Sequence, residues 1–201
     1  TLFIFTSDNG ASREGEEVGT SAYYVHLLQG DDIDADHDRL DLLGGPRTTP
    51  HYPRGWAMAS STPFRLYKIN THRGGHSVPF IASWPNGIPA DGSFRRQWGH
   101  VTDLLPTILG IVDGAAPTEQ ADGSPLDGAS LLPLWLDADA TTEHTEQVFE
   151  MNGHRGYYRD GWEAVTLHLP MTPFADERWE LYDLTADPTE LHDLAERRSE
   201  E

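Results

Sequence analysis

Apolar residues in this chain gather into short runs, and the spacing of each run predicts an element. Residues 2–6 (Leu-Phe-Ile-Phe-Thr) are almost continuously apolar, which predicts a strand buried on both faces. Ser7-Asp8-Asn9-Gly10 ends this run with polar turn chemistry. Residues 78–84 predict a second apolar strand bounded by turn residues. Residues 11–62 form a long excursion with weak periodicity, in which an acidic helix is expected from Asp34 to Leu43, and loops of this length are usually functional.

The clearest helical period lies in residues 101–112. One helix face collects six apolar side chains, namely Val101, Leu104, Leu105, Ile108, Leu109 and Val112. Pro106 is compatible with this helix only if the helix starts near Thr102 or Asp103, because proline is tolerated in the first turn.

The C-terminal third alternates short apolar runs with turns. Residues 148–169 predict two or three short strands with a turn at Arg159-Asp160-Gly161, and residues 178–184 predict a final strand. Asp187-Pro188-Thr189-Glu190 has the signature of a helix start and predicts a short terminal helix. The order of elements indicates an α/β body, residues 1–135, followed by a small antiparallel β-rich subdomain, residues 136–201.

Charge and composition exclude several classes of partner. The chain has 33 acidic and 14 basic residues, a net charge of −19, which argues against binding to nucleic acid or to an anionic membrane surface. No apolar run reaches the roughly 18 residues of a membrane-spanning helix. The absence of cysteine excludes disulfides, thiolate metal sites and a cysteine nucleophile within these residues.

Three features could carry chemistry. Asp8 and Asn9 directly follow a predicted strand and offer oxygen ligands that suit a hard cation, although an ordinary Asx turn explains them equally well. Lys68 is the only lysine and can bind an anionic oxygen or protonate a leaving group, while a surface lysine is the alternative. His72 and His76 flank Gly74-Gly75 ahead of the second strand, either as substrate-binding groups or as structural hydrogen-bonding residues.

The motifs around these residues resemble, in order and over nearly the whole chain, the C-terminal part of bacterial arylsulfatase-type sulfatases. This family belongs to the alkaline-phosphatase-like superfamily. The matching segments are Leu2 to Gly10, Gly55 to Lys68, Thr71 to Gly75, His100 to Thr107, Asp127 to Leu132, Trp179 to Leu184, Asp187-Pro188 and Asp193 to Ala195. The family usually has Glu-Gly-Gly where this chain has Arg73-Gly74-Gly75, so the role of that glutamate does not carry over.

The resemblance implies a sheet-and-helix sulfatase body with a small C-terminal antiparallel sheet and a terminal helix. It also implies hydrolysis of small-molecule sulfate esters, with Asp8 and Asn9 as two ligands of a Ca²⁺ ion and Lys68 as the catalytic sulfate-binding residue. The family nucleophile is a formylglycine made within Cys/Ser-x-Pro-x-Arg, and the resemblance places that nucleophile upstream of the segments matched here. The expected partner is therefore an N-terminal half that carries it.

Two alternatives remain at this stage. The chain could be an inactive fragment or pseudo-enzyme, or part of a related phosphodiesterase or phosphonate hydrolase, because metal-bound oxygen clusters also serve phosphoryl transfer. On the sulfatase interpretation, residues 1–201 alone are expected to lack activity and, with an apolar strand edge at Leu2 to Phe5, to aggregate.

Overall fold

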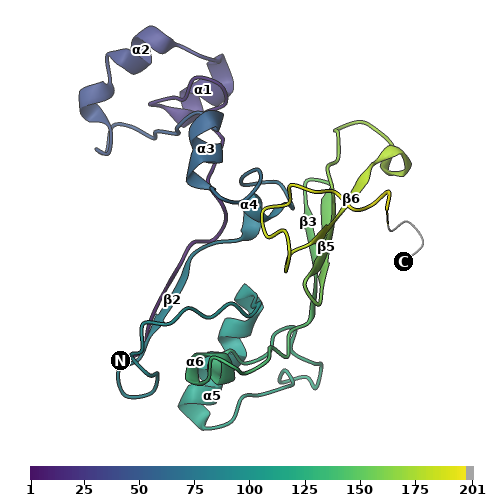
Figure 1. Ribbon diagram of the computed structural model, residues 1–201. Coiled ribbons are helices and arrows are strands. Elements are labelled where there is room, and N and C mark those ends of the chain that lie inside the picture. The colour runs from purple at the N-terminus through teal and green to yellow at the C-terminus, as the bar shows by residue number, and fades with distance from the viewer. Residues whose placement is uncertain (198–201) are drawn as a thin grey trace. The chain divides into compact units, whose positions relative to one another are not determined.

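The computed structural model describes residues 1–197, and the chain divides into two compact units. The first unit comprises residues 1–6, 80–147 and 158–161, and the second comprises residues 7–79, 148–157 and 162 onward. Figure 1 shows the elements of both units. Within residues 1–197, no helix combines the length and the apolar character that crossing a bilayer requires.

The first unit is built on two antiparallel strands. Strand β1 (Phe3–Thr6) pairs with β2 (Phe80–Ser83), with Phe3 opposite Ser83 and Thr6 opposite Phe80. The apolar runs predict both strands. The prediction that the first is buried on both faces is wrong in this chain, because Ile4 packs on the core while Phe3 and Phe5 are 60% and 55% exposed. Alternate side chains of a strand point to opposite faces, and here one face is covered.

The core of the first unit lies on helix α6 (Leu132–Leu136). Leu131, Leu134 and Trp135 are buried there, and residues from both strands and from α5 (Leu104–Asp113) pack against them. Trp135 also approaches the ring of Phe80, with 6.0 Å between centroids. These contacts join the strand pair and the two helices into one layer-on-layer unit.

Helix α5 begins where Pro106 requires. A 3₁₀ turn, η2 (Val101–Asp103), precedes it, and the backbone N–H of His100 donates to Asp103 Oδ2 at 2.7 Å, which caps the start. The six apolar side chains of the predicted helix face are only partly covered. Val101, Leu105, Ile108 and Val112 are 41–73% exposed, whereas Leu104 and Ile111 contact the core.

Asp103 holds the loop that follows α5. It is fully buried, and its Oδ1 accepts hydrogen bonds from the backbone of Ala129 at 2.9 Å and from the His144 ring at 2.6 Å. Gly128 fits here because a Cβ would lie 2.3 Å from the carbonyl oxygen of Thr102. The segments His100 to Thr107 and Asp127 to Leu132 therefore act as one packed structural unit.

The second unit contains the long excursion and most of a four-stranded sheet. Its helical turns are α1 (Tyr23–Gln29), α2 (Ile33–His37), η1 (Leu40–Leu42), α3 (Arg54–Ser60) and α4 (Arg73–His76). Single backbone pairings between Thr20 and His51 and between Ala22 and Thr49 close the base of the excursion. Asp36 Oδ1 accepts a hydrogen bond from the backbone N–H of Ser21 at 2.6 Å, which ties α2 to that base.

The sheet has the order β3-β4-β5-β6 and follows the expected run of short strands. Its strands are β3 (Glu146–Met151), β4 (His154–Arg159), β5 (Trp162–Thr166) and β6 (Trp179–Asp183), with the 3₁₀ turn η3 (Phe174–Asp176) before the last strand. Strands β5 and β6 are antiparallel, with Trp162 opposite Asp183 and Thr166 opposite Trp179.

The predicted terminal helix does not form between β6 and Arg197. Asp187 Oδ2 accepts hydrogen bonds from the backbone N–H groups of Leu191 and His192, both at 2.8 Å, so the aspartate closes a turn instead of capping a helix. Glu190 has φ 57°, in the left-handed region, which interrupts any helix started at Asp187.

Candidate active site

The loop that carries Asp8 and Asn9 lies against the segment that carries Lys68. The backbone N–H of Lys68 donates to the carbonyl of Ala11 at 2.9 Å, and that of Gly10 donates to Gly75 at 2.8 Å. Two main-chain hydrogen bonds therefore bring the loop of Asp8 to Ala11 beside the segment that holds the only lysine of the chain. The sequence alone could not show this contact between residues far apart in the chain.

Three glycines allow the backbone to pack closely in this region. A Cβ on Gly10 would lie 1.8 Å from the carbonyl oxygen of Gly74, and one on Gly75 would lie 2.0 Å from that of Asn70. Gly74 is equally crowded, because a Cβ there would lie 2.2 Å from two carbonyl oxygens of the preceding segment. The buried hydroxyl of Ser61 adds a link, because it donates to Gly74 O at 3.2 Å and accepts from the Ala11 N–H at 3.3 Å. A side chain at Gly10 would force the two segments apart, and one at Gly74 or Gly75 would displace their turn from residues 65–70.

Asp8 and Asn9 offer oxygen ligands but not a complete metal site. Asp8 is exposed, and the Asn9 amide nitrogen donates to the carbonyl of Gly10 at 2.8 Å, which leaves its side-chain oxygen as an acceptor. Among residues 1–197, no group of three or more His, Cys, Asp or Glu side chains could hold a metal ion. Because Ca²⁺ takes six to eight oxygen ligands, these two fit it only as part of a larger set.

Lys68 has an ionic partner that sequence reasoning missed. Its Nζ lies 2.6 Å from Glu14 Oε1, and Glu14 Oε2 lies 3.8 Å from His51 Nδ1. Burial tends to raise the pKa of Glu14, but the hydrogen bond from Lys68, a backbone hydrogen bond and the charges of Lys68 and His51 together lower that pKa below its ordinary value. Three glutamates crowd this loop, Glu14, Glu16 and Glu17, and the pattern gives no signal for which one meets the lysine.

His72 lies in the interior of the second unit. It is fully buried, and its Nε2 lies 3.3 Å from Glu180 Oε2, a carboxylate that also binds Arg65 at 2.5 Å and the Tyr182 hydroxyl. Burial lowers the pKa of His72 despite Glu180, which favours a neutral imidazole at neutral pH. These contacts give His72 a positioning role next to the turn it precedes, and its predicted contact with substrate stays a prediction.

His76 connects α4 to the sheet of the second unit. His76 Nε2 lies 3.1 Å from the buried Glu163, and its ring stacks on Phe149 with 4.4 Å between centroids. The His76 side chain keeps 25% exposure, so its predicted substrate contact also stays open to test.

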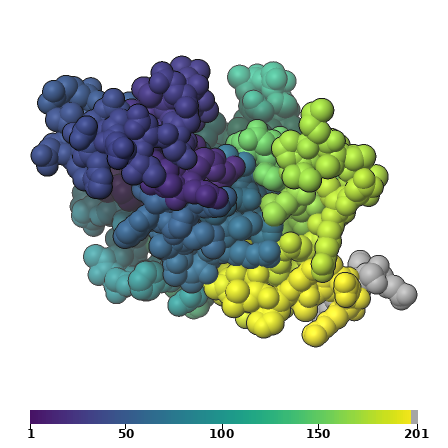
Figure 2. Space-filling model, turned by 90° about the horizontal axis from the view of Figure 1, so that it is seen from above, coloured from purple at the N-terminus to yellow at the C-terminus, as the bar shows by residue number. Residues whose placement is uncertain are grey.

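Arg73 stands where the family usually has glutamate, and its contacts are with the C-terminal segment. Its guanidinium donates to the carbonyl of Pro188 at 2.8 Å and lies over the Phe64 ring, while its backbone N–H donates to Glu190 Oε2 at 2.9 Å. In Figure 2 the yellow C-terminal segment lies against the blue segment that includes these residues. Arg73 therefore anchors the start of α4 to the turn that contains Pro188 and Glu190.

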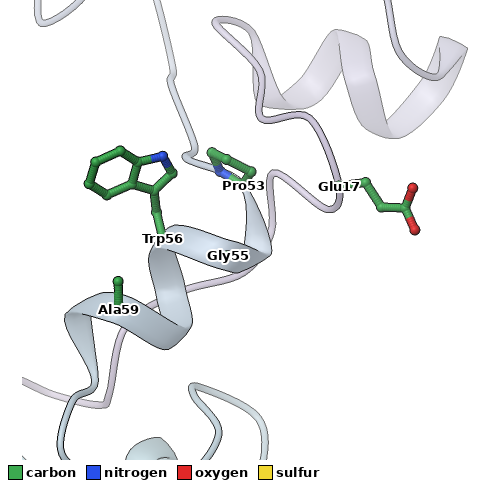
Figure 3. Close-up of a pocket in the computed structure, with 5 residues that line it drawn as sticks. All are labelled: Glu17, Pro53, Gly55, Trp56 and Ala59. Atoms are coloured by element: carbon green, nitrogen blue, oxygen red, sulfur yellow. The ribbon is translucent and has the colours of Figure 1, made fainter.

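A shallow hollow of about 420 Å³ lies elsewhere in this unit. Glu17, Pro53, Gly55, Trp56 and Ala59 line it, and none of the predicted site residues does. Figure 3 shows the Trp56 indole standing on α3 beside Pro53, with the Glu17 carboxylate pointing away from both. Trp56 is 64% exposed, so the hollow presents an aromatic face rather than a catalytic group.

Comparisons with known proteins match this chain to sulfatases. The sulfatase family matches residues 1–115. An uncharacterized sulfatase of Schizosaccharomyces pombe is 31% identical over 200 residues, which cover 97% of this chain and 34% of that protein. The ulvan-active sulfatase of Formosa agariphila is 32% identical over 152 residues, 60% of this chain and 29% of its own length.

Solved structures show the same fold. A protein from work on glycosaminoglycan metabolism by Bacteroides thetaiotaomicron matches 100% of this chain and 36% of its own, with a TM-score of 0.59 at 22% identity. The structure of Ps i-CgsB matches 100% of this chain and 33% of its own, with a TM-score of 0.58 at 20% identity.

The fold is thus the mixed α/β fold of these solved structures, as expected from the sequence. The chain belongs to the sulfatase family. It spans 34% and 29% of the lengths of the two curated relatives, about a third of each.

Proposed function

We propose that this chain is the C-terminal part of a sulfuric ester hydrolase of the arylsulfatase type, in which Lys68 binds the sulfate group. The observation that carries the proposal is the backbone pairing of the Asp8–Ala11 loop with the Lys68–Gly75 segment in a chain of the sulfatase family. It brings the loop of two oxygen ligands beside a cation, as recognition of an oxyanion requires.

In this proposal each residue has a separate task. Asp8 and Asn9 contribute two oxygen ligands to a Ca²⁺ ion whose remaining ligands lie outside these residues, and that ion would supply positive charge to the sulfate. The Lys68 ammonium neutralises charge on a sulfate oxygen and can donate a proton to the leaving oxygen. The formylglycine nucleophile is proposed to come from the N-terminal part of a longer chain. Ser61-Thr62-Pro63-Phe64-Arg65 has the spacing Ser-x-Pro-x-Arg, but the Ser61 hydroxyl is buried and donates to Gly74 O in the backbone packing of this region.

The same proposal gives the chain's parts their family roles. Residues 1–135 are the end of the catalytic domain, and residues 136–201 are the small C-terminal subdomain. The substrate is a small sulfate ester, and the exposed Trp56 would suit an aryl or sugar ring. The match to an ulvan-active sulfatase supports testing a sulfated polysaccharide beside aryl sulfates.

The test compares a longer protein that contains residues 1–201 with its Lys68→Ala variant. Loss of a charge that stabilises the transition state should lower kcat/KM for p-nitrophenyl sulfate by about 10²–10³-fold. Arg178→Ala, which removes a cation that is 73% exposed, is the matched control and should retain activity. A fully active Lys68→Ala variant would remove Lys68 from the site.

Two further measurements separate this proposal from its alternatives. Calcium removal should abolish turnover, and p-nitrophenyl sulfate should be hydrolysed in preference to the corresponding aryl phosphonate and phosphate diester. Preference for a phosphorus substrate would assign the protein to a phosphonate hydrolase or phosphodiesterase instead. Absence of turnover with every substrate would support a pseudo-enzyme.

A further inference from the structure

We infer that Glu14 sets the charge selectivity of the Lys68 site, favouring singly charged sulfate esters over doubly charged anions. This inference rests on the proposed function, because it takes Lys68 as the sulfate-binding residue. It assigns a role to a residue that belongs to none of the motifs on which the resemblance depends.

Lys68 and Glu14 form a close ion pair. Lys68 Nζ and Glu14 Oε1 are 2.6 Å apart, and the Lys68 and Glu14 side chains are 36% and 18% exposed. Glu14 Oε2 is buried and has no hydrogen-bond partner within residues 1–197, and the nearest cationic candidate beyond the lysine is His51 at 3.8 Å. The carboxylate thus contacts the Lys68 ammonium directly, so an anion bound at Lys68 would lie close to the negative charge of Glu14.

The effect of Glu14 on an anion bound at Lys68 depends on the charge of that anion. Lys68 and Glu14 together carry no net charge, so an anion bound at Lys68 is attracted by one charge and repelled by another at similar range. The cost of loosening the ion pair is the same for every anion. The remaining repulsion from Glu14 is twice as large for a dianion as for a monoanion, because Coulomb energy is proportional to charge.

Sulfate esters, inorganic sulfate and phosphate monoesters differ in charge. A sulfate monoester carries one negative charge, whereas inorganic sulfate carries two and a phosphate monoester carries nearly two at neutral pH. Glu14 would therefore weaken binding of the product and of phosphate monoesters more than binding of the substrate. Both effects favour turnover of sulfate esters.

The experiment measures monoanion and dianion binding in parallel. In the longer protein that contains these residues, Glu14→Gln should lower the inhibition constant of inorganic sulfate about tenfold more than it lowers KM for p-nitrophenyl sulfate, given partial solvent screening. Turnover of p-nitrophenyl phosphate should rise relative to the sulfate ester. Glu17→Gln is the matched control, since it removes the same charge from the same loop at a side chain that is 79% exposed.

Two further variants test whether the charge of Glu14 is responsible for the selectivity. Glu14→Asp retains the charge and should keep the wild-type selectivity, and Glu14→Met must reproduce the effect if Glu14→Gln is unstable. Equal changes in KM and in the sulfate inhibition constant, or the same change in Glu17→Gln, would overturn the inference while leaving the role of Lys68 intact. Full activity of Lys68→Ala would instead overturn the proposed function on which it rests.

Discussion

Glu190 is an acidic side chain that the fold buries almost completely, at 1% exposure. Burial, and then the negative charge of Glu163, raise the pKa of Glu190 from 4.5 to about 8, although the backbone N–H of Arg73 and the charges of Arg73 and Arg65 oppose the change. The folded state therefore holds the proton more tightly than the unfolded chain does. Its stabilising effect is complete below pH 4.5 and is lost as pH rises through about 8.

The size of this effect follows from the shift. At about 1.4 kcal/mol per pKa unit, the change from 4.5 to about 8 gives a ceiling of about 5 kcal/mol in the free energy of unfolding. Glu190→Gln cannot ionise, and its amide oxygen can still accept the hydrogen bond from Arg73. The variant should match the wild type in acid and exceed its stability in alkali, because it avoids the cost of a buried charge.

The assay is thermal unfolding of the wild type and Glu190→Gln across the range from acid to alkaline pH. With roughly 2–4 °C per kcal/mol for a protein of this size, the difference in Tm should grow to at least about 5 °C in alkali. Glu196→Gln, at an 88% exposed side chain, should show no such growth. A Tm difference that does not depend on pH would refute the reasoning, since it would show that Glu190 does not take up a proton on folding.

Two further predictions concern packing. Asp103→Ala should lower the free energy of unfolding by about 3–5 kcal/mol, because it leaves His144 and two backbone N–H groups without their buried acceptor; denaturant unfolding measures this, and a loss below about 1 kcal/mol would contradict it. Gly10→Ala should cost about 1–3 kcal/mol and reduce sulfate ester hydrolysis, because its Cβ would lie 1.8 Å from Gly74 O. Gly55→Ala, whose Cβ would meet no atom within 4 Å, should leave the free energy of unfolding nearly unchanged.

The sequence predicted the elements better than it predicted their surroundings. Apolar continuity located β1 and β2, and the position of Pro106 located the start of α5, because these depend on local properties of the chain. The exposed faces of β1 and α5 were not predictable, since periodicity tells which side chains share a face but not whether a neighbour covers it.

The candidate site shows the same division. Asp8, Asn9 and Lys68 were identified from residue type and from family motifs, whereas their proximity depends on main-chain hydrogen bonds between distant segments. The ion pair of Lys68 with Glu14 is also a tertiary contact. So is the hydrogen bond from the backbone N–H of Arg73, at the start of α4, to Glu190. The prediction of a terminal helix was wrong because the Asp187 side chain accepts hydrogen bonds from N–H groups beyond the turn. The sequence signature of a helix cap does not distinguish a capping aspartate from one that closes a turn.

The backbone pairing of Thr20 with His51 has a consequence for engineering. The N–H of each residue donates to the carbonyl of the other, at 2.8 and 2.9 Å, so the residues between them leave and return at one point. The entropic cost of closing such a loop changes only slowly with its length. Residues 21–50 can thus be exchanged as a cassette, for shorter or longer sequences, without altering the main-chain hydrogen bonds that fix Lys68 beside the Asp8–Ala11 loop.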